Sequence, residues 1–65
     1  MRFDAKKLSK LRKAARLRED GLLRKARMTQ SQLRACAAGR YELTLAELIR
    51  LASAVGVEPS ALVRD

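Results

Sequence analysis

The sequence has no histidine, no tryptophan, one cysteine and only two aromatic residues. A lone cysteine, Cys36, cannot form an internal disulfide, and without histidine or a second cysteine the chain lacks the ligands of a zinc-type site. There is also no nucleophile beside a base, no glycine-rich phosphate loop and no cluster of carboxylates. We therefore expect a protein without metal, cofactor or enzymatic activity.

Long apolar runs are missing as well. No stretch approaches the ~18 residues of a membrane-spanning helix, and the basic N-terminus is not followed by the apolar segment of a secretory signal. The single thiol suits a reducing compartment. These absences predict an intracellular location and no membrane partner.

The apolar residues that are present favour helices. Leucine and alanine each occur eleven times, whereas valine and isoleucine together occur four times in the 65 residues. Leucine and alanine are strong helix formers, and the β-branched and aromatic residues that suit strands are scarce. With one proline, three glycines and no linker or repeat, residues 1–65 read as one all-α domain.

The net charge of +8 is unevenly distributed. Residues 1–40 carry thirteen basic and three acidic side chains, a net of +10, and residues 41–65 carry two and four, a net of −2. Such a basic half is typical of nucleic-acid-binding domains. It also fits an anionic membrane surface or a merely solvated face. The basic stretch 4–16 lacks the bulky apolar side that a membrane-surface helix needs.

Two helices are expected before residue 29. Asp4 is a good N-cap, and the apolar residues after it recur at helical spacing, which predicts a first helix over roughly 4–16. A second short helix lies within 17–28. The break between them is open in the sequence: Asp20-Gly21 is a turn-like dipeptide, but Glu19 and Asp20 also suit the first turn of a new helix.

The later boundaries have clear signals. A threonine followed three residues later by Gln or Glu occurs twice, as a capping box does, and each such segment ends at a glycine. Pro59 suits the first turn of a last short helix. The third predicted helix begins after Thr29 and ends near Gly39, and the fourth begins after Thr44 and ends near Gly56. A fifth helix is predicted over 58–63. The fourth has a broad apolar face of Leu45, Leu48, Ile49, Leu51, Ala52 and Val55.

The third predicted helix begins with polar residues suited to reading DNA. Gln30 can make paired hydrogen bonds to adenine in the major groove, and Ser31 can donate to or accept from several bases. Leu33, Cys36 and Ala37 recur at helical spacing and are expected to face the core. The simpler interpretation is that Thr29 and its partner form only a capping box.

The segment from Arg24 to Val63 resembles the Cro/CI phage-repressor family, also called the XRE-type helix-turn-helix. The resemblance lies in the polar start at 28–31, the turn glycine at 39, and the run LAELIRLASAVGV at 45–57 before the short helix at 58–63. An alternative register would make 29–33 the start of the family's second helix. The run at 45–57 would then follow at once and leave no room for a recognition helix, so we reject it.

The resemblance implies a lambda-repressor-like bundle of five short helices that acts as a transcriptional regulator, a repressor or Cro-like protein. Its partner would be double-stranded operator DNA, bound as a homodimer in the cytoplasm of a bacterial or phage-infected cell. The residues implied as base contacts are Thr29, Gln30, Ser31 and Arg34. Those implied as phosphate contacts are Arg12, Arg18, Arg27, Gln32 and Arg40.

Several positions depart from the family pattern. The glycines expected before the second helix and in the following turn are Arg16 and Arg27. In the family, a Glu late in the recognition helix commonly pairs with an arginine of the first helix. Here Ala37 stands at that position. The loss of the ion pair either weakens the tie between helices one and three or leaves Arg12 free to contact a phosphate. Further departures are Arg18, Glu19 and Leu23. The missing ion pair, the lost turn glycines and Glu19 favour the alternative, an antitoxin-like or protein-interaction module with weak or non-specific DNA binding, whose partner would be a toxin or a polymerase.

Two more side chains carry expectations. Cys36 is expected to act as a small apolar core residue rather than a redox sensor. Tyr41 is expected to be partly buried, with a phosphate contact through its hydroxyl as the alternative.

Overall fold

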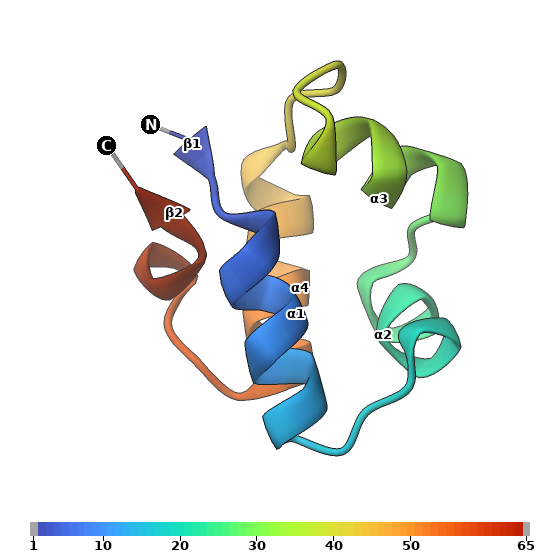
Figure 1. Ribbon diagram of the computed structural model, residues 1–65, viewed down its shortest axis with the longest axis vertical. Coiled ribbons are helices and arrows are strands. Elements are labelled where there is room, and N and C mark those ends of the chain that lie inside the picture. Colours follow the sequence, from blue (N-terminus) through green and yellow to red (C-terminus); the bar gives the residue numbers. More distant parts are fainter. Residues whose placement is uncertain (1, 65) are drawn as a thin grey trace.

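The computed structural model describes residues 2–64 and contains four α-helices, a 3-10 turn and a short two-stranded ribbon. Figure 1 shows α1 (Ala5–Ala14) and α4 (Leu45–Val55) near the centre, with α2 (Glu19–Ala26) and α3 (Gln30–Ala37) on one side. The 3-10 turn and the ribbon lie on the other side. The mainly helical fold class is confirmed.

The break between α1 and α2 falls earlier than the dipeptide Asp20-Gly21. Helix α1 begins after Asp4, whose carboxylate accepts a hydrogen bond from the Lys7 N–H at 3.0 Å, and it ends at Ala14. Arg16 takes the left-handed conformation, with φ of 55°. Glu19 and Asp20 form the acidic first turn of α2, which suits the positive end of the helix dipole. The turn interpretation of Asp20-Gly21 is therefore wrong.

Both predicted capping boxes are present. Thr29 and Thr44 each accept a hydrogen bond from the N–H three residues on, and the side chains of Gln32 and Glu47 bond back to the two threonine N–H groups. Each box satisfies two N–H groups that the first turn would otherwise leave unpaired. The helices end as expected too, because Gly39 and Gly56 have positive φ, at 77° and 76°.

The segment predicted as a fifth helix is shorter and tighter than expected. Residues Pro59–Leu62 form a 3-10 turn, η1, and the chain then becomes extended as β2 (Val63–Arg64). Strand β2 pairs antiparallel with β1 (Arg2–Phe3), so the two ends of the chain lie side by side (Figure 1). The Asp4 N–H continues this pairing by donating to the Leu62 carbonyl at 2.8 Å. The composition predicted no strands, so the ribbon of β1 and β2 was not expected from the sequence.

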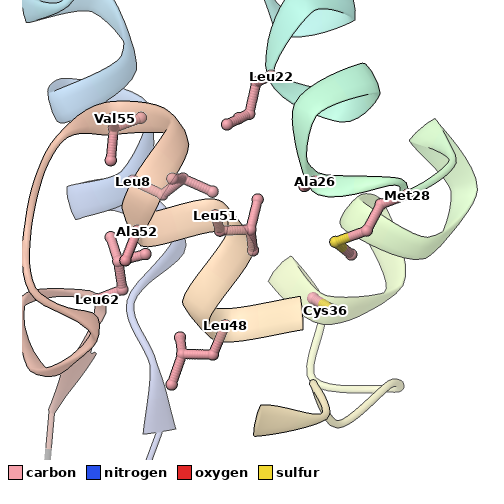
Figure 2. Packing of buried hydrophobic residues seen from close by; sticks show 10 residues of the cluster. All are labelled: Leu8, Leu22, Ala26, Met28, Cys36, Leu48, Leu51, Ala52, Val55 and Leu62. Carbon is pink, nitrogen blue, oxygen red and sulfur yellow. The ribbon is translucent and has the colours of Figure 1, made fainter. Parts of the chain in front are cut away.

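The core is aliphatic and centred on α4. Its side chains interdigitate between α1, α2 and η1 (Figure 2), and Leu22, Leu51 and Leu62 are fully buried. The buried hydrophobic residues are Leu8, Leu22, Ala26, Met28, Cys36, Leu48, Leu51, Ala52, Val55 and Leu62. Arg50 adds a polar tie, because its Nε donates to the Ala26 carbonyl at 2.8 Å and so fixes the end of α2 to α4.

The apolar face predicted for α4 is narrower in the structure. Leu48, Leu51, Ala52 and Val55 are buried, but Leu45 and Ile49 are exposed. Their exposure places them on the solvent-facing side of α4.

Candidate nucleic-acid interface

The N-terminus of α3 presents the predicted base-contacting residues to solvent. Thr29, Gln30, Ser31 and Arg34 are all exposed, and Cys36 is the one buried residue of the helix. Gln30 and Arg34 are one turn apart and therefore share a face. The short helix is thus anchored near its C-terminal end, and its polar start lies at the surface.

Gln32 is partly committed to the capping box. Its side-chain Oε1 accepts from the Thr29 N–H at 2.9 Å, and the Thr29 Oγ1 accepts from the Gln32 N–H at 3.1 Å. The amide Nε2 of Gln32 has no protein partner among these bonds. The capping interpretation and the phosphate-contact prediction are therefore compatible.

Gln30 is held by a residue of α2. Its Nε2 donates to the Glu19 Oε1 at 3.0 Å, and this bond joins the N-termini of the two helices. An ionised carboxylate only accepts hydrogen bonds, so Glu19 fixes which end of the amide faces it. The Oε1 of Gln30 is left facing away from Glu19. The hydrogen-bond partner of Glu19, a departure from the family pattern, is thus the Gln30 amide.

Two arginines stand where the resemblance expects glycine, and both have left-handed backbones. Arg16 has φ of 55° and Arg27 has φ of 57°, and both side chains are exposed. A left-handed conformation costs a residue with a Cβ roughly 1–2 kcal/mol. The chain therefore turns at the positions where the family pattern places glycine, although arginine occupies them.

Arg12 makes a hydrogen bond within the chain. Its NH1 donates to the Leu17 carbonyl at 2.9 Å, so the guanidinium is half-buried and holds the loop between α1 and α2. The position of its expected partner is Ala37, which lines a hollow of about 170 Å³ between α1, α2 and α3. The prediction that Ala37 faces the core is wrong, because its one-carbon side chain stays exposed beside this hollow.

The remaining phosphate candidates are on the surface. Arg18, Arg27 and Arg40 are exposed. Arg18 and Arg24 each approach Asp20, at 3.7 and 3.9 Å, but these ion pairs are exposed and contribute little. Of the thirteen basic residues in 1–40, Arg12 is half-buried and the others are exposed. The positive charge of this half is therefore largely available to a polyanion.

The loop that carries Arg40 is held to α4 by a hydrogen bond that no local sequence pattern predicted. Tyr41 is half-buried, as expected, and its hydroxyl donates to the carboxylate of Glu47 at 2.9 Å. Glu47 is only 8% exposed. The Thr44 N–H bond is the main cause that lowers the pKa of Glu47, and the bond to Glu47 is the main cause that raises the pKa of Tyr41. The capping box signalled Glu47, but nothing local signalled its bond to Tyr41.

Cys36 lies in the core, as predicted. Burial, followed by the nearby negative charge of Glu47, raises the pKa of its thiol, which keeps it protonated and unreactive. Within residues 2–64, no group of three metal-ligating side chains comes together. No helix over this range is both long and apolar enough to cross a membrane.

Comparisons with family models, with curated proteins and with solved structures found no match to this chain. The resemblance to the Cro/CI family therefore stays a prediction, and the function must be argued from the geometry of the chain itself.

Proposed function

We propose that this protein is a sequence-specific DNA-binding transcriptional regulator of the helix-turn-helix type. The observation that carries the proposal is α3, which buries the Cys36 side chain and exposes Gln30, Ser31 and Arg34. Only a three-residue connection, 27–29, separates it from α2. A short helix held in this way can enter the major groove with its N-terminal side chains against base edges.

The basic surface supports the same proposal. Exposed arginines flank α3 on both sides, Arg27 before it and Arg40 after it. Such side chains supply salt-dependent affinity for phosphates through release of counterions, whereas base contacts supply discrimination. With Arg18, Arg12 and Gln32 they form the proposed phosphate contacts. The proposed base contacts are Thr29, Gln30, Ser31 and Arg34.

The mode of action follows from occupancy. A protein that binds an operator regulates by mass action, as a repressor or Cro-like switch does. One eight-residue helix spans only a few base pairs, so we propose a homodimer that reads two half-sites about one helical turn, ~34 Å, apart. The site of action would be the cytoplasm of a bacterial or phage-infected cell.

A protein-interaction module is the second candidate. Among residues 2–64 no ion pair joins α1 to α3, since Ala37 stands at the expected position, and Glu19 adds a negative charge where DNA would lie. Both features favour a domain whose partner is another protein, a toxin or polymerase, with weak or non-specific DNA binding.

Selection of bound duplexes from a random pool, repeated at two salt concentrations, tests the proposal. We expect an inverted repeat to be enriched, and Gln30→Ala to lower discrimination at one base pair per half-site by about 1–3 kcal/mol. Ser53→Ala, at an exposed position of α4, is the matched control. Binding that is governed wholly by salt and is unchanged by Gln30→Ala would overturn the proposal and favour the second candidate.

A further inference from the structure

A groove of about 610 Å³ lies on a part of the molecule that the proposed DNA contacts do not use. It is bounded by the ribbon β1–β2, the C-terminal end of α3, the loop 38–44 and the start of α4. Apolar side chains from three of these segments line it, among them Phe3, Leu43, Leu45 and Val63.

The apolar surface continues from the groove onto α4. Leu45 is 69% exposed and Ile49 is 47% exposed, and they are the large hydrophobic residues left exposed within 2–64. They are four residues apart on one helix, so they are neighbours on the same face. Exposed apolar surface next to a groove is typical of a binding site for another macromolecule.

We propose that a second copy of this chain occupies the groove, with the two copies related by a two-fold axis. In a two-fold contact, a patch on one copy faces the same patch on the other copy. The patch must therefore carry charges of both signs that complement each other across the axis. The groove meets this condition: Arg2 and Arg64 on the ribbon line one side, and Glu42 in the loop lines another. All three are exposed. Each copy can place its Glu42 against the two arginines of the other.

The location also suits a protein that carries a net charge of +8. Most of the groove comes from residues 41–64, outside the half that carries a net charge of +10. Two copies can therefore meet here while their basic surfaces remain apart, which lowers the repulsion between them.

The position of α3 favours a second copy over a different protein, and this step rests on the proposed function. The C-terminal end of α3 borders the groove, and the helix, which has eight residues and is about 12 Å long, runs away from the groove. Two α3 helices that run away from a shared groove would present their N-termini on opposite sides of the dimer, as the reading of two half-sites requires.

Sedimentation equilibrium without DNA, over a range of protein concentrations, tests the surface. The unaltered chain should form dimers reversibly, and Leu45→Glu with Ile49→Glu should weaken dimerisation tenfold or more. Ala14→Glu puts the same charge on an exposed position at the end of α1, outside the groove, and should leave dimerisation unchanged. Circular dichroism checks that every variant is folded.

A charge exchange tests the pairing itself. Glu42→Arg alone, and Arg2→Glu with Arg64→Glu alone, should each weaken the dimer because like charges then face each other. An equimolar mixture of these two variants should form a heterodimer, in which every facing pair is opposite in sign. Failure of the mixture to associate would overturn the proposed pairing.

The two proposals can fail separately. A chain that stays monomeric at concentrations on the order of 1 mM, which corresponds to at most about 4 kcal/mol of association, overturns this inference. A dimer that is insensitive to the changes at Leu45 and Ile49 overturns it as well. A groove-dependent dimer that enriches no DNA sequence leaves this inference standing and removes only the proposed function.

Discussion

Gln30 in α3 donates a 3.0 Å hydrogen bond from its amide to the carboxylate of Glu19 in α2, eleven residues earlier. Glu19 cannot donate, so the amide nitrogen must face it and the Gln30 Oε1 points elsewhere. In the proposed complex, that oxygen would accept from the exocyclic amine of adenine or cytosine and disfavour guanine, whose O6 is an acceptor. In that complex, Glu19 would act as a positioning residue for the proposed base contact.

Glu19→Gln should relax this preference. A neutral amide both donates and accepts, so Gln30 could turn in either direction, and discrimination against guanine at its base pair should fall by about 1 kcal/mol. Overall affinity should rise, since a negative charge near phosphates is removed. Competition binding with duplexes altered at that base pair measures both effects.

Glu58→Gln is the control for the charge change. Glu58 is exposed at the start of η1 and makes no side-chain capping bond. It should raise affinity slightly without altering base preference. If Glu19→Gln leaves the preference for each base unchanged, Glu19 does not orient Gln30.

Arg27→Gly should stabilise the fold and weaken DNA binding. Glycine relieves the left-handed strain at φ of 57°, and we expect the free energy of unfolding to rise by about 1 kcal/mol. The same change removes a proposed phosphate contact, so the slope of log affinity against log salt should become shallower by about 1. Urea unfolding and salt titration measure the two quantities.

Arg24→Gly provides the contrasting case for stability. Arg24 lies inside α2, is exposed, and makes only a weak ion pair. Glycine in a helix costs about 1 kcal/mol, so the same substitution should lower the free energy of unfolding there. If both variants shift stability in the same direction, the left-handed conformation of Arg27 is not a source of strain.

The buried Glu47 should make stability depend on pH in the acid range. Its pKa is lower in the folded chain than the usual value of 4.5, so the stabilisation is present above that value. It is lost as the pH falls through the lower folded pKa. Urea unfolding between pH 2 and pH 7 should show this loss, and Glu47→Gln should reduce the slope in that window.

Tyr41→Phe separates the contribution of the tyrosine bond. It removes one donor to Glu47 but keeps the ring, and the Thr44 N–H still donates to the carboxylate at 2.9 Å. We expect a loss of about 1 kcal/mol at neutral pH and a smaller acid slope than in the unaltered chain. An unchanged slope would mean that the Tyr41 bond does not contribute to the low pKa.

The two sides of α4 should respond differently to truncation. Leu51 is fully buried, so Leu51→Ala should cost about 2–5 kcal/mol. That is comparable to the total stability of a domain of this size, and circular dichroism should show an unfolded chain. Leu45→Ala, at a residue 69% exposed, should change the stability of the dilute protein by less than 1 kcal/mol. Equal losses would contradict the orientation of α4.

The sequence alone was sufficient for features that depend on hydrogen bonds between near neighbours. The capping boxes at Thr29 and Thr44 and the glycine endings of α3 and α4 each involve residues within one turn of each other. Their chemistry is therefore visible in local spacing. The same holds for the mainly helical class and for the polar start of α3, which leucine, alanine and the cap residues already indicate.

Tertiary structure decided the features that join distant segments. The bond from Arg50 to Ala26, the bond from Gln30 to Glu19 and the ribbon of Phe3 with Val63 connect residues 24, 11 and about 60 positions apart. No local pattern encodes such partners, because they depend on how the helices pack. Packing also exposed Leu45 and Ile49 and held two arginines in a glycine-like conformation. Local spacing thus predicted where helices α3 and α4 begin and end, and packing determined which of their faces remain open to a partner.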